Sequence, residues 1–529
     1  MPKYDAIIVG SGLAGVHAAV PLVEQGLTVA LLDVGHTESK TKEEDGRTFE
    51  EVRKSDPKQH ELFLGEDFSG IGLGEGHARA MVSGRRSFVT QGSLEYAPLF
   101  SGEARVLQSF AQGGLSAAWS GICDVYDSQE LDAVGLPAKH MRKHYEAVIR
   151  RIGVSGVSDD FSLQMPPTMD DAAREILRRY RSRKEHVARH GIAIEQPMYA
   201  MLTEKREGRT PVAYRDMDFW DNNGRAMYRA SHTLEELQRN RNFSYIGDML
   251  ALSIENPRKD GDVVVVTRNV KSHVTTRYVG KSLVLAAGSV NTTRILMRSF
   301  GHYDTPAPII MKNHYIVPCL FPAQLGKRPD PRRHSLTQLA MHGLSRIDGM
   351  RDLYAQILSY NSLLLYKLLH YMPLPVPEAF SLLSVLTPAL IFVDIRFPSS
   401  MDERHKVILR KRGDGDTLEI AYPEDAGTKR TQEHIVRKAK RALRGLGLFP
   451  LTEAREAYGT TSQYAGGVPI GEETMGRLTV KQSGQLHGHE RIFVADSASW
   501  RALPAKPSGL TIMANANRVG SEVARFLST

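Results

Sequence analysis

The sequence predicts a mixed α/β fold, for three reasons. An apolar β run at 7–9 is followed by a glycine-rich turn, an Ala- and Val-rich helical segment and a second β run at 29–32. Two further apolar β runs, at 282–285 and 491–494, return much later in the chain, and helical segments follow them. Short strands and amphipathic helices fill the regions between. This order is typical of a Rossmann-like parallel sheet built from distant segments and joined to an α+β part with its own sheet.

Length and composition describe a globular protein of more than one domain. The chain has 529 residues, of which 41% are hydrophobic and 24% charged, and this length is too great for a single core. The net charge of +8 comes from Lys and Arg interspersed with Asp and Glu, and no nucleic-acid-binding motif is present, so we expect no nucleic-acid partner. Cys123 and Cys319 form neither a disulfide framework nor a metal-ligand spacing. We expect no metal site and a cytoplasmic protein without a signal peptide.

The first glycine-rich turn has the G-x-G-x-x-G spacing of dinucleotide-binding proteins, formed by Gly10, Gly12 and Gly15. Gly10 permits the tight turn, Gly12 lets the backbone approach a pyrophosphate, and Gly15 allows close packing of helix on strand. The helix directs its N-terminal N–H groups and its dipole at the phosphates. Asp33 follows the second β run and can accept hydrogen bonds from a ribose. Because an acid there repels a 2′-phosphate, the sequence favours NAD or FAD over NADP.

Three later stretches favour a flavin over a nicotinamide cofactor. The stretch Gly113-Gly114-Leu-Ser116 allows the backbone to lie flat against a bulky planar group, although a tight turn alone explains it equally well. A returning β run ends in Ala286-Ala287-Gly288, as in flavoproteins, whereas a simple NAD domain continues with βα units. Asp496 ends the last β run and can hold ribityl hydroxyls or organise a water on the pyrophosphate. The helix that begins near 510–512 can direct N–H groups at a flavin ring.

The middle of the chain predicts further helices and strands. Thr168 or Asp170 can cap a helix that runs to about residue 189. Residues 431–448 form an amphipathic helix with a basic face, which we interpret as solvated, with an anionic partner or a lipid surface as the alternative. Four successive β runs predict an antiparallel meander: 243–246, 251–254, 263–267 and 273–278.

Residues 353–393 allow several interpretations. Apolar residues recur at helical spacing from Leu353 to Leu368, and residues 379–393 carry no charge. Pro388 interrupts the second stretch, which is too short to span a membrane. We favour a buried core or lid helix. The alternatives are an apolar substrate channel and a contact with a membrane surface or a partner.

Taken together, these motifs resemble the glucose–methanol–choline (GMC) oxidoreductase family. The resemblance runs over the whole chain and rests on the ordered motifs above, together with Val494-Ala-Asp496 and Thr511-Ile512. It implies bound FAD and oxidation of an alcohol or sugar hydroxyl, with hydride transfer to flavin N5. It also implies a substrate-binding domain whose β-sheet is the floor of the active site. On this basis the FAD-binding domain comprises 1–160, 228–304 and 468–529, and the substrate-binding domain comprises 161–227 and 305–467.

The sequence departs from this family at two places. Members that resemble the pyranose oxidases attach FAD covalently through a His just before the Trp of the second glycine-rich stretch. Here Ala118 precedes Trp119, so we expect noncovalent FAD. The family also has a catalytic His, assisted by a His or Asn beside a Pro before the last helix. At the first position the sequence has Tyr464 or Gln463, and at the second it has Lys506 or Pro507.

This second departure changes the expected chemistry. A Tyr hydroxyl has a pKa of about 10 and does not accept a proton at neutral pH without help, and Gln cannot act as a base. Lys506 can lower the pKa of Tyr464 or stabilise an alkoxide, unless it is a solvent-exposed lysine. The substitute bases are His314, His487 and His489.

The main hypothesis is an FAD-dependent oxidoreductase that acts on a hydroxyl-bearing small molecule, sugar-derived or amphipathic. Because the family His is absent, two alternatives stay open. One is double-bond reduction or isomerisation of an apolar substrate, and the other is a flavin-binding subunit without turnover. The candidate catalytic residues are Tyr464, Gln463 and Lys506. The candidate cofactor-binding residues are Gly10, Ser11, Gly12, Leu13, Ala14, Gly15, Asp33, Gly113, Gly114, Ser116, Trp119, Ala287, Gly288, Asp496, Ser497, Leu510, Thr511 and Ile512.

Overall fold

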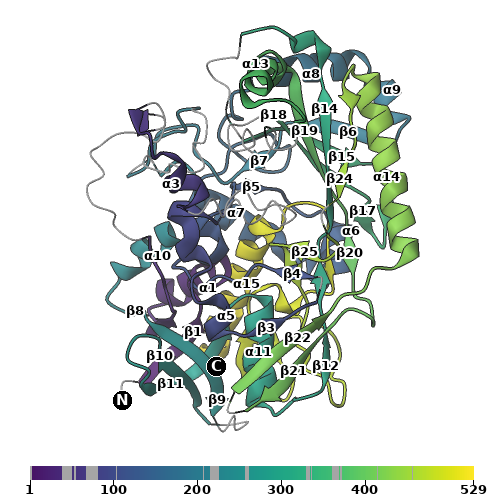
Figure 1. Ribbon diagram of the computed structural model, residues 1–529. Coiled ribbons are helices and arrows are strands. Elements are labelled where there is room, and N and C mark those ends of the chain that lie inside the picture. The colour runs from purple at the N-terminus through teal and green to yellow at the C-terminus, as the bar shows by residue number, and fades with distance from the viewer. Residues whose placement is uncertain are drawn as a thin grey trace.

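Two large β-sheets organise the protein (Figure 1). One is mostly parallel and begins β-α-β at the N-terminus, and the other is antiparallel; we call them the parallel sheet and the antiparallel sheet. The mixed α/β fold that the sequence predicts is therefore confirmed at this level. The computed structural model describes residues 3–38, 51–52, 55–66, 82–102, 104–206, 208–214, 225–255, 261–328, 334, 336–359, 369, 372–413, 415–455 and 457–529.

The parallel sheet is assembled from three distant parts of the chain. β1 (Lys3–Val9) pairs in parallel with β2 (Val29–Leu32), and α1 (Leu13–Glu24) connects them. The last four residues of β1 are all buried, as expected for a central strand with both faces covered. The strand order is β27 (Gln485–Leu486), β28 (His489–Val494), β11 (Thr275–Leu285), β1, β2 and β8 (Phe243–Ile246), and β10 (Val263–Asn269) and β9 (Met249–Glu255) branch from β11.

The predicted meander is wrong at its first strand. β8 pairs in parallel with β2, because the exposed edge of β2 binds it: Val29 N–H donates to Asn242 O (2.8 Å) and Asp33 N–H donates to Ile246 O (3.1 Å). β9, β10 and β11 do pair antiparallel in sequence. However, β11 continues without a break through the predicted returning strand at 282–285. One long strand therefore pairs antiparallel with β10 and parallel with β1.

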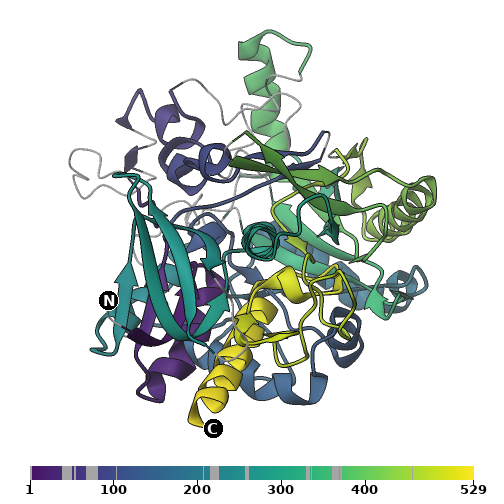
Figure 2. The ribbon, with the colours of Figure 1, turned by 90° about the horizontal axis from the view of Figure 1, so that it is seen from below.

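Helices cover both faces of the parallel sheet. Ala6 and Ile8 of β1 face a core shared with α1, α10 (Ala230–Gln238) and the C-terminal α15 (Gly509–Ser528). Ile7 and Val9 face the opposite core, which includes α7 (Ala138–Ile152) and α11 (Ser289–Ser299). Residues from opposite ends of the sequence thus share one core, and in Figure 2 the yellow α15 lies near the purple N-terminal strands and helix.

The antiparallel sheet packs one face on helices and turns the other face inward. Tyr315, Val317 and Val393 on the first face contact α8 (Asp171–Ser182), α9 (Lys184–Ala188) and α14 (Ala426–Gly445). Asp170 caps α8, as predicted, by accepting from Ala173 N–H (2.9 Å). The strand order is β23 (Phe449–Pro450), β14 (His314–Leu320), β19 (Leu390–Arg396), β18 (Tyr354–Ser359), β15 (Thr337–Gly343) and β6 (Ile192–Glu195), with β24 (Ala454–Arg455) also on β14.

The smaller sheets connect these two layers. A four-stranded sheet of β12 (Pro306–Pro308), β21 (Lys406–Arg412), β22 (Gly415–Ala421) and β3 (Leu99–Phe100) packs on α11. Among the short ladders, β13 (Ile310–Met311) pairs with β26 (Tyr464–Ala465). Each large sheet collects segments that are far apart in the chain, whereas the domain boundaries assigned above stay predictions.

Within 353–393, the prediction of a helix is wrong where the chain forms strands, and the prediction of burial is wrong for the helix that is described. Two parts of this region, β18 and β19, are strands of the antiparallel sheet, and residues 360–368 of the predicted helix lie outside the described residues. A strand that is buried on both faces gives a continuous apolar run, which sequence periodicity cannot tell from a buried helix. Among the described residues of this region, Val376–Leu386 form helix α13, which buries Ala379 and Leu383 and exposes most of its other residues. Over the described ranges, no helix is both long and apolar enough to cross a bilayer.

The contact between the first and last helices depends on Gly520 of α15. A Cβ at this position would lie 2.2 Å from Ala18 O and 2.7 Å from Pro21 Cγ of α1. We expect Gly520→Ala to push the helices apart and to lower the free energy of unfolding by about 2–3 kcal/mol, measured by urea unfolding. Gly471→Ala is the matched control, because nothing lies within 4 Å of its added Cβ, and it should change stability by less than about 0.5 kcal/mol. Equal effects in the two variants would contradict the described packing.

Candidate functional site

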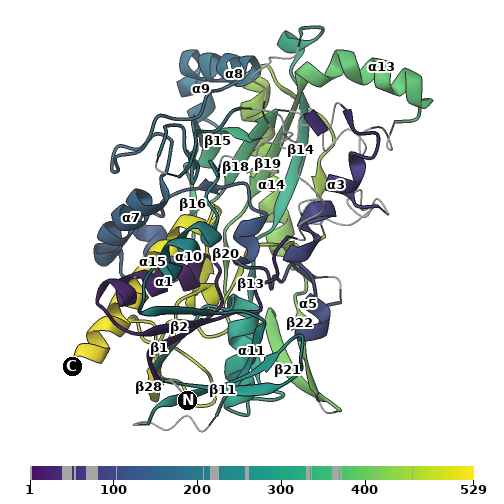
Figure 3. The ribbon, with the colours of Figure 1, turned by 90° about the vertical axis from the view of Figure 1, so that its left-hand side faces the viewer.

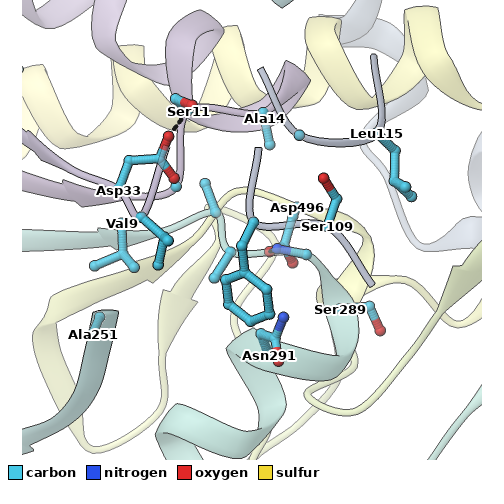
Figure 4. A pocket seen from close by; sticks show the side chains of 18 of the residues that line it. Val9, Ser11, Ala14, Asp33, Ser109, Leu115, Ala251, Ser289, Asn291 and Asp496 are labelled. Carbon is cyan, nitrogen blue, oxygen red and sulfur yellow. Dashed lines mark hydrogen bonds between the residues drawn. The ribbon is translucent and has the colours of Figure 1, made fainter. Parts of the chain in front are cut away.

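A cavity of about 1300 Å³, including its open mouth, lies at the carboxyl ends of the parallel strands (Figure 4). The end of β1, the start of α1, the end of β2 and the turn after β11 form its walls. Open α/β sheets bind their ligands in this crevice. The predicted site residues that line the cavity are Gly10, Ser11, Gly12, Leu13, Ala14, Asp33, Gly114, Ser116, Ala287, Gly288, Gln463, Tyr464, Asp496, Ser497 and Ile512.

The first glycine-rich turn presents backbone donors to this cavity. α1 begins after Gly12 with no capping side chain and no acidic residue in its first turn. The first N–H groups of the helix and the positive end of its dipole are therefore available to an anion. Gly10 has a φ of 97°, and a Cβ at Gly15 would lie 1.8 Å from Gly10 O, so both positions require glycine.

Asp33 is a buried carboxyl group at the edge of the cavity. Its Oδ2 accepts from Ser11 Oγ, the dashed line in Figure 4, and from the Tyr245 hydroxyl at 3.3 Å. Burial raises the pKa of Asp33 to about 7, although these hydrogen bonds oppose the rise. Within the described part of the chain no cationic side chain lowers its pKa. The hydroxyl groups of a ligand would satisfy its remaining acceptor sites.

The second glycine-rich stretch packs directly on the first. Gly113 and Gly114 have φ angles of 85° and 59°, and a Cβ at Gly114 would lie 3.2 Å from Gly12 Cα. Gly113 N–H also donates to Ser11 Oγ (2.9 Å). Ser116 Oγ donates to Gly113 O (2.6 Å) and accepts from Ala230 N–H (3.0 Å). The Ser116 side chain thus fixes the loop, and the loop's backbone forms part of the wall.

Asp496 ties the ends of two parallel strands together. Its Oδ2 accepts from Gly288 N–H (2.8 Å) and from Thr292 Oγ1 (2.6 Å), and its Oδ1 accepts from Ala498 N–H (2.9 Å). Burial raises the pKa of Asp496 to about 6, while these hydrogen bonds lower it. Asp33 and Asp496 are thus two buried acids that line the same cavity.

The remaining predicted cofactor-binding residues lie outside the cavity lining. Gly15, Gly113, Trp119, Leu510 and Thr511 are not among the lining residues. Trp119 Nε1 donates to Tyr228 O (2.6 Å), and a Cβ at Gly509 would lie 2.5 Å from the Trp119 ring. The Thr511 hydroxyl lies 2.7 Å from the Tyr145 hydroxyl. The side chains of Trp119 and Thr511 thus pack α15 against its neighbours.

The structure does not bring the predicted catalytic pair together. Tyr464 lines the cavity, but its hydroxyl donates to Leu107 O (3.1 Å), and burial raises its pKa well above the ordinary value. Lys506 Nζ donates to Val125 O (2.8 Å) and lies 3.4 Å from Glu130 Oε2 and 3.8 Å from Asp124 Oδ1. None of these contacts joins Lys506 to Tyr464. Lys506 is also buried, so its interpretation as a solvent-exposed lysine is wrong.

Of the three substitute bases, His314 has the most organised surroundings. Its Nδ1 lies 2.9 Å from Asp394 Oδ1, and Arg396 donates to the same carboxylate (2.8 Å). Burial alone would raise the pKa of Asp394, but Arg396 and His314 hold it well below its usual value. His487 Nε2 lies 2.9 Å from Gly471 O, and the His489 ring packs 4.4 Å from the Phe300 ring.

His314 is also linked to the cavity wall through the backbone. Met311 of β13 pairs with Tyr464 of β26, and Lys312 N–H donates to Gln463 O (3.0 Å). Lys312 is fully enclosed, and its Nζ donates to Lys506 O (2.6 Å). Burial lowers the pKa of Lys312 well below its ordinary value. The segment that leads to His314 is therefore hydrogen-bonded to the cavity-lining residues Gln463 and Tyr464, while His314 itself is not among the lining residues.

Several lining residues were not predicted from the sequence. Arg294 and Arg298 of α11 line the cavity, and Arg298 binds both oxygens of Asp416 (2.6 and 2.7 Å). Asn291 Oδ1 is buried and lacks a hydrogen-bond partner among the described residues. Residues 249–252 of β9 supply an apolar wall, and nothing in their sequence separates them from an ordinary core strand.

Comparisons with known proteins add no identification. A scan against models of protein families found none that matches the chain, and a search of curated proteins found no match.

The raised pKa of Asp33 predicts a specific dependence of stability on pH. A buried carboxyl whose pKa is raised binds its proton more tightly in the folded state, so the ligand-free protein loses stability as the pH rises from about 4 to about 7. Asp33→Asn removes this loss. Relative to the wild type, the variant should gain about 2–4 kcal/mol of unfolding free energy between about pH 4 and pH 8, measured by urea unfolding.

Asp394→Asn is the control for this prediction, with the opposite sign. Because the pKa of Asp394 is lowered in the folded state, its carboxylate stabilises the protein at neutral pH, and this contribution disappears as the pH falls. The Asp394→Asn variant should therefore be weakest, relative to the wild type, at neutral pH. Parallel stability curves for wild type and Asp33→Asn would show that Asp33 is not the buried acid described.

Proposed function

We propose that the protein is an FAD-dependent oxidoreductase of the GMC type that takes a hydride from a hydroxyl-bearing small molecule. The observation that carries this proposal is the cavity in which two glycine loops, the N-terminus of α1, Asp33 and Asp496 meet. In this proposal the parallel sheet belongs to the FAD-binding domain, and the antiparallel sheet belongs to the substrate-binding domain. Bound FAD would supply the hydride acceptor.

The residues around the cavity fit this cofactor. Uncapped N–H groups at the start of α1 suit a pyrophosphate, and no acidic side chain in the first turn opposes it. Asp33 would accept hydrogen bonds from the ribose hydroxyls. The apolar residues 249–252 would cover the adenine ring, and the unpartnered Asn291 Oδ1 offers a buried acceptor. The mutual approach of Gly12 and Gly114 leaves backbone rather than side chains against the ligand.

Ala118 supports noncovalent attachment. It is buried beside Trp119 and has no side-chain nucleophile, so this position cannot form a bond with a flavin. The cofactor would be held by hydrogen bonds and packing alone.

For the proton of the substrate hydroxyl, we propose His314 in place of Tyr464 or Lys506. Tyr464 holds its own proton tightly, and Lys506 is charged, because Asp124, Glu130 and Asp127 raise its pKa even though burial opposes this. A neutral imidazole can take the proton directly. Asp394 then stabilises the imidazolium and fixes the ring, as the carboxylate partner of a general base does.

The first prediction concerns the cofactor itself. The purified protein should be yellow, and acid or heat should release intact FAD. Asp33→Ala should weaken FAD binding by about 1–3 kcal/mol through lost ribose hydrogen bonds, measured by titration of the flavin-free protein. Asp262→Ala changes an exposed acid that directly precedes β10 and should leave the affinity unchanged. Flavin that remains with the denatured protein would contradict noncovalent binding.

The second prediction separates the candidate bases. In anaerobic mixing with a panel of alcohols, His314→Gln should slow flavin bleaching by about 100-fold, the scale of lost general-base catalysis. Tyr464→Phe removes a hydroxyl that bonds to Leu107 O and should change the rate less than about threefold. Asp394→Asn should slow bleaching and move the lower limb of the pH profile to lower pH, since the imidazolium loses its carboxylate.

The outcomes distinguish the proposals from one another. If Tyr464→Phe slowed flavin bleaching and His314→Gln did not, Tyr464 rather than His314 would be the base. Bound flavin that no alcohol reduces would overturn alcohol oxidation while leaving FAD binding intact. It would then favour double-bond chemistry, or a subunit without turnover if apolar enones also fail.

A further inference from the structure

Helix α13 carries its apolar residues on the outside. Ala379 and Leu383 are its buried residues, whereas Val376, Phe380 and Val385 are 68%, 54% and 51% exposed. Amphipathic surface helices such as α14 do the reverse, burying apolar residues and exposing charged ones. In Figure 3, α13 extends outward from the end of the antiparallel sheet, and the same green helix stands clear of the other elements in Figure 2.

Further exposed apolar residues lie at the same end of the antiparallel sheet. Phe321 N–H donates to Ala389 O (2.8 Å), so the turn that follows β14 lies at the foot of α13, and Leu325 of this turn is exposed. Leu451 N–H donates to Pro318 O (2.8 Å), which brings exposed Phe449 and Leu451 to the end of β14. The exposed apolar area therefore extends from the helix to its neighbours.

Basic side chains border this area. Lys327 and Arg328 are exposed in the same turn as Leu325. The Arg179 guanidinium lies 4.9 Å from the centre of the Phe321 ring, so the basic helix α8 reaches the same end of the sheet. Glu378 is the one acidic residue in the sequence of α13. We call α13 together with Leu325, Lys327, Arg328 and Phe449 the sheet-end surface.

We propose that the sheet-end surface docks on the interface of an anionic lipid bilayer. Apolar side chains would enter the boundary between headgroups and acyl chains, and the neighbouring cations would contact anionic headgroups. With 11 residues, α13 is too short to span a bilayer but long enough to lie in its interface. A projecting convex helix suits a deformable lipid layer. A symmetric pair of protein copies would instead place Lys327 and Arg328 of one copy near those of the other.

The inner face of the antiparallel sheet continues from this surface toward the polar cluster around His314. Along β19, Leu390 and Phe392 are followed on the same face by Asp394 and Arg396, because side chains alternate along a strand. Leu390 and Phe392 share a small core with Leu383 of α13. An amphipathic alcohol would thus meet apolar residues at the bilayer end and polar residues near His314. This consequence rests on the proposed function, whereas the docking itself does not.

Vesicle sedimentation tests the docking without any substrate. The full-length chain is mixed with vesicles of phosphatidylcholine alone or of phosphatidylcholine with phosphatidylglycerol, and the bound fraction is measured. Binding should be stronger to the anionic vesicles and should weaken as salt is added. Phe380→Ser combined with Val385→Ser should weaken binding by at least about tenfold. Lys327→Gln combined with Arg328→Gln should abolish the preference for anionic vesicles.

Val274→Ser combined with Met475→Ser is the matched control. Both residues are more than half exposed and lie away from the sheet-end surface, so this variant should bind vesicles as the wild type does. Circular dichroism and flavin content check that each variant folds. Equal binding of wild type and the Phe380/Val385 variant, or no binding of the wild type, would overturn the proposal. A dimer that this same variant dissociates would also overturn it and would assign the surface to a second copy of the chain.

Discussion

Direct contact between backbones is the constraint on which the rest of this structure depends. A Cβ at Gly15 would lie 1.8 Å from Gly10 O, and one at Gly520 would lie 2.2 Å from Ala18 O. A Cβ at Gly114 would lie 3.2 Å from Gly12 Cα, which is a looser but still close approach. These contacts draw α1 onto the parallel sheet, the last helix onto α1, and the second glycine loop onto the first. The cavity takes its shape from them, because backbone N–H groups rather than side chains form the wall at the start of α1.

Three buried aspartates show how the surroundings give one residue type different properties. Asp33 and Asp496 lack cationic partners among the described residues, and burial raises their pKa values to about 7 and about 6. Asp394 is less enclosed, with a side chain that is 15% exposed, and Arg396 and His314 keep its pKa low. The two acids of the cavity therefore destabilise the empty protein near neutral pH, and a ligand with hydroxyl groups would relieve this cost. The acid of the antiparallel sheet stabilises the protein and orients a histidine.

The sequence predicts what local spacing determines and fails where long-range packing decides. A few neighbouring residues determine the glycine turn, the place of Asp33 at the end of β2 and the role of Asp170 as a helix cap. The structure has each of these as predicted. The direction of the Tyr464 hydroxyl instead depends on Leu107, which lies far away in the sequence.

Two further features could not be predicted for the same physical reason. Arg298 and Asp416 are 118 residues apart, and no local pattern links them. The sequence of strands β18 and β19 predicts a helix, because burial on both faces removes the alternation that marks a strand. For α13 the sequence favours a core position and leaves an exposed face only as an alternative, because the apolar pattern does not show which neighbours the fold provides. In the proposed function, the short ladder of β13 and β26 then gains a simple role. It holds Tyr464 and the segment that leads to His314 together through backbone hydrogen bonds. His314 can therefore serve as the base in place of Tyr464 without a change in this backbone arrangement.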